Sequence, residues 1–377
     1  MLLFPDHHSL HNRCVIVVSG CCLLIIFIAR PTLPRFETPK VHHPKNRVIL
    51  IWTKWYGQRL WDALPEGMLS CAQYNINVSC RITYNKQVYE RAHMVVFHGR
   101  GLDFALENLP KSSQRLVHQR WVYFTRESPL FSGLLSNPQD GKKLNGLFNW
   151  TMTYKLDSDI DYRYFRIVPG KHPDEYNLSP KFKDEMAVAV VSNCRPDRLN
   201  FIDELQRYIT VHVYGSCGDY SCPSEEDCFS MLKNRYKFYL AFENSVCKDY
   251  VTEKFYHNAL QHNMLPVVIS GGNFNNPTVA PPDCCIIATN FKGAKELAEY
   301  MKKVANNSTL YYSYFKWHSR YTVKEDFTTE VFCRACHKLY TDSQTKVCDD
   351  LYSWYGIRQN CLPYPLPYYS PYWHGRY

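Results

Sequence analysis

The sequence predicts an α/β protein with two doubly wound parallel sheets, and three observations lead to this prediction. Strand-like apolar runs alternate with helical patterns along most of the 377 residues. The stretch Lys237–Ser270 reads as strand, helix and strand within about 30 residues, which is the length of one βαβ unit. A chain of this length can also bury two cores. We therefore expect two facing domains, each built on a doubly wound sheet.

The amino terminus predicts a membrane segment. Residues 14–29 carry no charge and follow a short polar head, residues 1–13, which we expect to be cytoplasmic. Two alternatives exist. A buried core helix is disfavoured because prolines follow the segment immediately, and a cleaved signal peptide because the bulky residues before Ala29 make a poor cleavage site. An uncleaved signal anchor fits better, although it is short for the usual span of about 20 residues. Residues 30–46 form a proline- and histidine-containing stem.

The cysteines indicate an oxidising compartment. Thirteen of the sixteen lie beyond the apolar segment, an odd count that leaves at least one thiol free or paired between chains. Sequons for N-glycosylation point to the same lumen, with Asn177 doubtful because a proline follows its serine. They begin at Asn77, Asn149, Asn177, Asn306 and Asn307. Basic residues after the apolar segment outnumber Arg13 before it, which by the positive-inside rule favours a cytosolic body. We give the cysteines and sequons more weight.

The charge of the chain does not suggest a nucleic-acid partner. The formal net charge is +9, and the lysines and arginines are scattered along the sequence. The sequence contains no zinc finger and no RNA-binding signature. We therefore expect no nucleic acid among its partners.

Residues 47–170 predict the first α/β domain. Its expected strands are Val48–Thr53, Met94–His98, Arg120–Arg126 and Asn149–Tyr154. Glu127 follows the third strand and precedes Ser128-Pro129, so a carboxylate lies at the carboxyl end of a strand, where ligands bind parallel sheets. From position alone, a solvated loop residue is the slightly favoured interpretation of Glu127.

The triplet Asp157-Ser158-Asp159 has the form of a metal-binding D-x-D. Such triplets are common in loops, so on its own this one is weak evidence for a metal site; the family resemblance described below implies that it is structural.

Residues 171–336 predict the second domain. A buried strand, Met186–Ser192, leads into a helix that carries Arg198. The residues expected on the apolar face of this helix are Phe201, Ile202, Leu205 and Tyr208. The strand Val211–Tyr214 ends in a loop of small residues, Gly215–Gly218, which lets a ligand approach the backbone. No dinucleotide-binding glycine motif and no P-loop occur.

Within Lys237–Ser270 we expect a strand Phe238–Phe242, a helix Asp249–Asn263 and a strand Leu265–Ile269. Glu243 and Asn244 leave the first strand. The first turns of the helix are expected to carry Tyr250, Glu253 and Lys254. A lysine beside a helix amino terminus suits an anionic group. A strand Cys284–Ala288 and a helix Lys292–Val304 complete the predicted domain.

The C-x-x-C of Cys333 and Cys336 favours disulfides over zinc, because a zinc site needs a second ligand pair. Residues 337–377 form a cysteine- and Pro/Tyr-rich tail, which we expect to be extended after Cys361.

The chain resembles the α1,3-fucosyltransferases of glycosyltransferase family 10. The motif FYLAFENSVCKDYVTEKF, followed by LPVV, carries most of this resemblance, and three further blocks recur in order: WVYFTRESP, NWTMTYKLDSD and VVSNCRPDRLNFIDEL. The likeness covers roughly residues 47–336. It implies a GT-B fold of two Rossmann-like domains around a cleft, a type II protein in the Golgi membrane, GDP-fucose as donor and a GlcNAc-containing glycan as acceptor.

The resemblance also assigns roles to residues. Glu127 becomes the catalytic base. The residues implied at the donor are Arg198 and Lys254 at the diphosphate, Tyr250 and Glu253 at the nucleoside, and Asn244, Tyr239, Ser192, Asn193 and Tyr164 around it. The last of these departs from the family pattern P-Y-G, because Arg163 and Phe165 replace its neighbours. The implied disulfides are Cys71–Cys333 and Cys80–Cys336.

The implied reaction is an inverting transfer of L-fucose to a GlcNAc hydroxyl in α1,3 linkage. A carboxylate would take the proton from the acceptor while basic groups stabilise the leaving diphosphate, so no metal is required for donor binding. Manganese stimulates some members, which leaves metal dependence open. Two alternatives are an inactive glycan-binding relative and a GT-B transferase with another donor sugar. The sequence does not identify the acceptor glycan.

Overall fold

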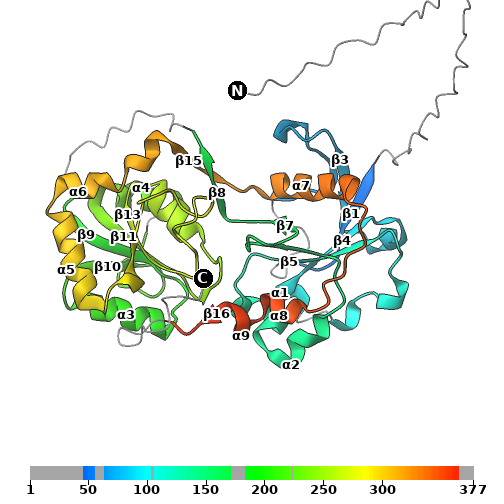
Figure 1. Ribbon diagram of the computed structural model, residues 1–377, viewed down its shortest axis with the longest axis horizontal. Helices are drawn as coiled ribbons and strands as arrows, with labels where there is room; N and C mark the ends of the chain where they lie inside the picture. The colour runs from blue at the N-terminus through cyan, green and yellow to red at the C-terminus, as the bar shows by residue number, and fades with distance from the viewer. Residues whose placement is uncertain (1–45, 56–62, 103–105, 171–182, 223, 365–377) are drawn as a thin grey trace, which may run out of the picture. The chain divides into compact units, whose positions relative to one another are not determined.

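Runs of aliphatic and aromatic residues form two parallel sheets in the computed structural model (Figure 1). The structure describes residues 46–55, 63–102, 106–170, 183–222 and 224–364. The predicted cytoplasmic head, the signal anchor and residues 30–45 of the stem lie outside these ranges, as do Asn177 and residues 365–377. Among the described residues, none of the helices combines the length and the apolar character that crossing a membrane requires.

The first sheet has seven strands in the order β2-β3-β1-β4-β5-β6-β7. Their bounds are β1 Arg47–Ile51, β2 Gly67–Ser70, β3 Ser79–Thr83, β4 Met94–His98, β5 Arg120–Thr125, β6 Trp150–Thr153 and β7 Ile160–Asp161. All neighbours are parallel except β2, which runs antiparallel to β3. The central strands β4, β5 and β6 are almost entirely buried, as apolar runs without alternation predict for a covered parallel sheet.

The second sheet has five parallel strands in the order β10-β9-β11-β13-β14. Their bounds are β9 Glu185–Val190, β10 Val211–Tyr214, β11 Tyr236–Phe242, β13 Leu265–Ile269 and β14 Ile286–Ile287. The strands predicted in both halves are therefore present, and most of their bounds differ from the predicted ones by one or two residues.

Helices accompany both sheets. The α-helices are α1 Gly99–Leu102, α2 Pro138–Gly141, α3 Pro196–Gln206, α4 Glu225–Arg235, α5 Ala294–Ala305, α6 Ser308–Ser313, α7 Thr328–Thr341, α8 Leu351–Tyr355 and α9 Ile357–Asn360. The 3-10 helices are η1 Ala72–Tyr74, η2 Lys86–Arg91, η3 Leu106–Asn108, η4 Ser112–Gln114, η5 Pro129–Phe131, η6 Gly133–Ser136, η7 Lys142–Leu144, η9 Ala288–Asn290 and η10 Lys316–Ser319.

Tyr208 was expected on the apolar face of α3, but it follows the end of this helix and is 36 % exposed.

The helix predicted at Asp249–Asn263 is much shorter in the structure, where η8 is a π-helix over Lys254–Leu260. Two backbone positions explain the difference. Asp249 has a φ of 64° and Asn263 a φ of 54°, and a right-handed helix does not pass through such residues. Tyr250 therefore lies in the loop before η8, and only Lys254 belongs to its first turn.

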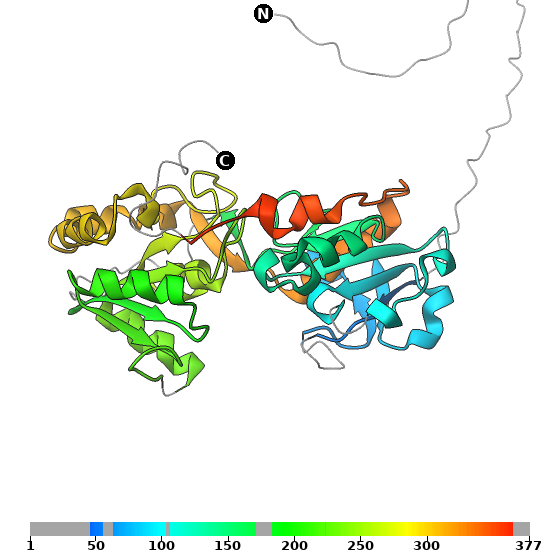
Figure 2. The same cartoon turned by 90° about the horizontal axis from the view of Figure 1, so that it is seen from below.

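Two small antiparallel pairs connect distant parts of the chain. Strand β8, Phe165–Pro169, pairs with β15, Tyr321–Glu325. Strand β12, Val246–Cys247, pairs with β16, Cys361–Leu362 (Figure 2). The two short helices α8 and α9 precede this strand, so they lie before the segment that was predicted to be extended.

Helix α7 returns to the first sheet late in the chain. Its buried residues Val331, Phe332 and Leu339 belong to the same apolar core as Ile49 and Val96. The predicted domain boundary at residue 336 falls inside this helix. The carboxyl-terminal part of the chain thus completes the core that the amino-terminal strands begin.

Candidate active site

A cavity of about 800 Å³ lies at the carboxyl ends of the second sheet's strands. In a parallel sheet these ends share one edge, so the loops that follow β9, β10 and β11 meet there. The lining residues are Val190, Ser192, Asn193, Arg198, Gly215, Cys222, Cys228, Phe229, Asn244, Glu253, Lys254, His257, Asn258 and His262. Six of the nine residues predicted at a donor therefore line one cavity, which we call the donor pocket: Ser192, Asn193, Arg198, Asn244, Glu253 and Lys254.

Lys254 places an ammonium group in the lining of the donor pocket, next to two glutamates. Its Nζ lies 2.8 Å from Oε1 of Glu253 and 3.6 Å from Oε2 of Glu243. Burial disfavours the charge, but the two carboxylates outweigh it and raise the pKa of Lys254 above its usual value. Burial raises the pKa of Glu253, because it disfavours this charge too. The Lys254 ammonium and hydrogen bonds to the carboxylate together lower the pKa by more, so the net shift is downward. Lys254 is therefore charged at neutral pH.

Glu243 organises the turn before η8, a role that was not predicted. Its carboxylate is buried and accepts from the backbone N–H and the hydroxyl of Thr252, each at 2.8 Å. Burial raises the pKa of Glu243. The Thr252 hydroxyl also accepts from Lys254 Nζ at 3.2 Å, so the strand end, the loop and the lysine are held together.

Arg198 is buried in the first turns of α3 and joins two strand-end loops. Its guanidinium donates to the carbonyl oxygens of Phe242 at 3.1 Å and of Asn193. Its Nε has no hydrogen-bond partner among the described residues. A buried donor of this kind at the pocket wall suits an anionic ligand.

A glycine and a disulfide shape the loops beside Asn193. Gly215 has a φ of 93°, and a Cβ there would come within 2.7 Å of the Val191 carbonyl oxygen, so a side chain is excluded. Cys194 and Cys217 form a disulfide that ties the loop after β9 to the loop after β10.

Tyr239 is not among the lining residues of the donor pocket. It is buried in β11, and its hydroxyl accepts from Asn258 Nδ2 at 2.9 Å. Burial raises the pKa of Tyr239 to about 12. Asn258 is a lining residue, so Tyr239 supports the pocket through Asn258.

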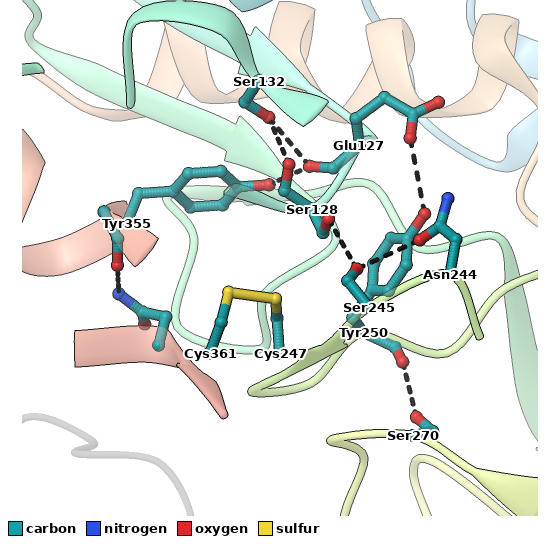
Figure 3. The surroundings of a disulfide bond; sticks show 12 residues. Glu127, Ser128, Ser132, Asn244, Ser245, Cys247, Tyr250, Ser270, Tyr355 and Cys361 are labelled. Carbon is teal, nitrogen blue, oxygen red and sulfur yellow. Dashed lines mark hydrogen bonds between the residues drawn. A yellow bond between two sulfur atoms is a disulfide. The ribbon is translucent and has the colours of Figure 1, made fainter. Parts of the chain in front are cut away.

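Glu127 and Tyr250 bring the two sheets' loops together (Figure 3). Glu127 follows β5, and Ser128 is held extended before Pro129, which begins η5. The Tyr250 hydroxyl donates to Oε2 of Glu127 at 3.4 Å. Burial raises the pKa of Tyr250 well above 10.0, so this hydroxyl remains a donor. Ser245 donates to the Ser128 hydroxyl at 2.6 Å, a second contact between the same loops.

Tyr164 lies beside this junction and outside the donor pocket's lining. Its hydroxyl donates to the Arg126 carbonyl oxygen at 3.0 Å, and the Arg126 guanidinium lies 4.2 Å from its ring centre. Its ring meets Tyr250 edge-on at 6.3 Å. Tyr164 therefore packs against the residue before Glu127 and against the partner of the Glu127 carboxylate.

The triplet Asp157-Ser158-Asp159 is engaged in structural contacts. One carboxylate oxygen of Asp159 accepts from the backbone N–H and hydroxyl of Thr151, and the other accepts from Lys346 Nζ at 2.7 Å. The Ser158 hydroxyl bonds the Thr153 hydroxyl at 2.6 Å. Among the described residues no group of three or more histidines, cysteines and carboxylates has the arrangement of a metal site.

Five disulfides join the described cysteines. Cys71–Cys333 and Cys80–Cys336 are the pairs that the resemblance implies, and they fasten α7 to the first sheet. Cys194–Cys217, Cys222–Cys228 and Cys247–Cys361 were not predicted. Free thiols in the described part of the chain are Cys284, Cys285 and Cys348.

The sequons differ in exposure. Asn77, Asn306 and Asn307 are exposed. The side chain of Asn149 is buried, where its oxygen accepts from the Trp121 backbone N–H and its nitrogen donates to the Lys346 carbonyl oxygen, both at 2.8 Å. A glycan needs an accessible amide nitrogen, so this geometry argues against the prediction for Asn149.

The chain was compared with known proteins. Residues 44–165 match the family model "Fucosyltransferase, N-terminal", and residues 180–354 match "Glycosyltransferase family 10 (fucosyltransferase) C-term". The human 4-galactosyl-N-acetylglucosaminide 3-alpha-L-fucosyltransferase 9 is 31 % identical over 365 residues, which cover 90 % of this chain and 96 % of that protein. The Pongo pygmaeus 4-galactosyl-N-acetylglucosaminide 3-alpha-L-fucosyltransferase FUT6 is 34 % identical over 302 residues, covering 79 % and 80 %.

Solved structures show the same fold. An α1,3-fucosyltransferase crystallised with GDP aligns with a TM-score of 0.51 at 18 % identity, covering 82 % of this chain and 94 % of that one. A structure of an α1,3-fucosyltransferase with GDP-fucose aligns with a TM-score of 0.50 at 19 % identity, covering 82 % and 95 %. The fold is thus the GT-B-like α/β fold of these enzymes. The chain belongs to the α1,3-fucosyltransferases of glycosyltransferase family 10 and is a glycosyltransferase.

Proposed function

We propose that this enzyme transfers L-fucose from GDP-fucose to the 3-hydroxyl of a GlcNAc residue, with inversion at the fucose anomeric carbon. One observation carries the proposal. The carboxylate of Glu127 contacts Tyr250, and Tyr250 lies four residues before Lys254 in the donor pocket. The loop that carries the proposed proton acceptor Glu127 is therefore hydrogen-bonded to the loop that leads to Lys254 of the cationic pocket.

The donor pocket suits a nucleoside diphosphate. Lys254 and the Arg198 guanidinium, which both line the pocket, supply positive charge for the diphosphate. In the described structure Lys254 pairs with Glu253, so binding of the diphosphate would release that carboxylate. Glu253 would then be free to accept hydrogen bonds from the ribose hydroxyls. Asn244 and Asn193 offer amides for the remaining polar groups.

The reaction requires one bond to form as another breaks. The acceptor oxygen bonds to the fucose anomeric carbon while the bond from that carbon to the β-phosphate oxygen breaks, through an oxocarbenium-like transition state. The acceptor's proton passes to Glu127, and the electron pair of the broken bond leaves with GDP. Lys254 and Arg198 stabilise the charge that develops on the diphosphate.

The relatives' names support the acceptor class. They describe 4-galactosyl-N-acetylglucosaminides, so we propose a GlcNAc-containing glycan as acceptor. For the location we propose the Golgi membrane, with residues 14–29 as a type II anchor and the catalytic body in the lumen. The uncharged segment, the disulfides and the exposed sequons support this proposal.

The experiment uses the full chain with GDP-fucose, GDP-mannose and a panel of GlcNAc-terminated and galactosyl-GlcNAc acceptors. Glu127→Gln should lower kcat by at least about 100-fold and leave GDP affinity unchanged, because only the proton acceptor is lost. Glu90→Gln, which changes an exposed glutamate elsewhere in the first domain, is the matched control and should behave as wild type.

Metal dependence is tested in the same assay. We propose that donor binding needs no metal, so EDTA should leave GDP affinity unchanged; added Mn²⁺ then measures any stimulation of kcat. GDP binding without transfer to any acceptor would support a glycan-binding relative and contradict the proposed transferase. Transfer only from GDP-mannose would overturn the assigned donor. Full activity of Glu127→Gln would remove Glu127 as the base.

A further inference from the structure

The C-terminal strap, which we define as residues 351–362, contains α8, α9 and β16 and lies against the Glu127 loop (Figure 3). The strap meets both loops that form the Glu127–Tyr250 junction. Its two connections differ in chemistry, since one is a hydrogen bond and the other is covalent.

The first connection is Tyr355. Its side chain is buried, and its hydroxyl donates to the Glu127 carbonyl oxygen at 2.5 Å. Ser132 donates to the same carbonyl at 3.1 Å, and the Glu127 N–H donates to the Thr125 hydroxyl at 3.2 Å. Burial raises the pKa of Tyr355 well above 10.0, so its hydroxyl stays protonated. The main chain of Glu127 is therefore held on both sides.

The second connection is the disulfide Cys247–Cys361. It lies in the β12–β16 pair, and the next N–H along, that of Lys248, donates to the Asn360 carbonyl oxygen at 2.7 Å. The Tyr250 N–H then donates to the Cys247 carbonyl oxygen at 3.0 Å. Because the Tyr250 hydroxyl bonds the Glu127 carboxylate, the contacts form a closed ring from Glu127 through Tyr250, the disulfide and Tyr355 back to Glu127.

A buried lysine anchors the strap between these two connections. Lys155, just after β6, donates through Nζ to the Trp354 carbonyl oxygen at 2.7 Å and to Asn360 Oδ1 at 3.1 Å. Asn360 in turn donates to the Gly356 carbonyl oxygen at 2.9 Å. The strap is therefore fixed to the first sheet as well as to the Tyr250 loop.

We propose that Tyr355 and the Cys247–Cys361 disulfide are positioning groups, which hold the main chain and the carboxylate of Glu127 in the place that proton transfer requires. The inference rests on the proposed role of Glu127 as base. Displacement of a catalytic group by about 1 Å can cost about 100-fold in rate, so small movements of this loop matter.

Tyr355→Phe removes the hydroxyl and keeps the ring. We expect kcat to fall by about tenfold or more, with the Kd of GDP and the KM of GDP-fucose unchanged, because the donor pocket is not altered. Tyr352→Phe is the matched control, since Tyr352 is also buried in α8 and its hydroxyl has no hydrogen-bond partner among the described residues. The control should keep wild-type kcat.

A variant could lose activity because less of it folds or because Glu127 is displaced, and the number of GDP-binding sites distinguishes these two causes. Calorimetric titration with GDP gives the number of binding-competent molecules, and kcat is expressed per GDP site. The double variant Glu127→Gln/Tyr355→Phe provides a second test. If Tyr355 acts through Glu127, the additional change should have little effect once the base is absent.

The disulfide is tested with Cys247→Ser/Cys361→Ser. Its kcat per GDP site should also fall by about tenfold or more, whereas Cys348→Ser, which removes a free thiol upstream of the strap, should be unaffected. Wild-type kcat in both Tyr355→Phe and the serine pair, with Glu127→Gln inactive, would overturn the positioning role and leave the proposed function intact. If wild-type enzyme transfers no fucose, or Glu127→Gln stays active, the proposed function or the base assignment has failed instead.

Discussion

At the scale of single residues, the donor pocket is organised by opposite charges close together. Lys254 lies between Glu253 and Glu243, and burial alone would disfavour all three charges. Mutual attraction keeps Lys254 charged and, under the proposed function, offers the diphosphate a cation that already has a fixed position. The same arrangement makes the stability of the protein depend on pH.

We predict that Glu253→Gln lowers stability in a defined pH window. Burial raises the pKa of Glu253, but attraction to Lys254 and hydrogen bonds to the carboxylate together lower it by more, so the folded pKa lies below 4.5. The contribution of Glu253 to stability is therefore present above 4.5 and is lost as pH falls through the folded value. Lys254 has a folded pKa above 10.5, so its contribution is complete below 10.5 and is lost at higher pH. The variant should be less stable between these limits.

The size of this effect is limited by solvent. The Glu253 side chain is 45 % exposed, so the loss should not exceed about 1 kcal/mol. Urea unfolding of variant and wild type should show the difference near neutral pH and its disappearance toward about pH 3. Glu299→Gln, at an exposed position of α5, should show little difference at any pH. A difference that grows on acidification would contradict the assigned charges.

At the scale of elements, α7 shows how a late helix can complete an early core. The pairs Cys71–Cys333 and Cys80–Cys336 lie side by side between α7 and the first sheet, and they close loops of 262 and 256 residues. Once either bond exists, the other closes only a short ring. The two bonds are therefore partly redundant as constraints on the unfolded chain.

We predict that removal of these two bonds is not additive. Replacing Cys80 and Cys336 by alanine should cost about 3 kcal/mol, because the remaining pair still closes the long loop, and removing Cys71 and Cys333 as well should cost about 5 kcal/mol more. Denaturant unfolding of the two variants measures both steps. Cys285→Ala, a free thiol, is the control. Equal costs for the two steps would contradict the redundancy.

At the scale of the whole molecule, a protein that folds in the secretory lumen carries N-glycans only on sequons whose asparagine remains accessible. The occupancy of the sequons therefore tests both the proposed compartment and the fold. We predict that the chain expressed in a secretory host carries N-glycans at Asn77 and at Asn306 or Asn307, all exposed, and none at Asn149, which is buried and bonded. Glycopeptide mass spectrometry after enzymatic release in heavy-oxygen water identifies each modified asparagine. A glycan on Asn149 of folded, active enzyme would be inconsistent with this structure.

The sequence alone predicted most strands and the family, and six of the nine residues predicted at a donor line one cavity. Apolar runs such as Met94–His98 and Leu265–Ile269 mark strands because their burial is a local property of the chain. The family resemblance assigned Ser192, Asn193 and Asn244 to the donor, and sheet geometry explains why they lie together, because parallel strands bring their carboxyl ends to one edge. The long motif around Lys254 identified the family because it extends over eighteen residues.

Only the tertiary structure decided how these parts are connected. The partners of Glu127 come from Tyr250 and Tyr355, 123 and 228 residues away, and no local pattern records contacts between such distant positions. The pairing Cys247–Cys361 cannot be deduced from sequence, because the same cysteines can be connected in many different ways and the sequence does not show which are close in space. The burial of Asn149 likewise depends on the strands and the Lys346 segment packed around it. Local chemistry specified the elements and a family motif indicated the donor-site residues, whereas long-range packing determined which residues contact the proposed base.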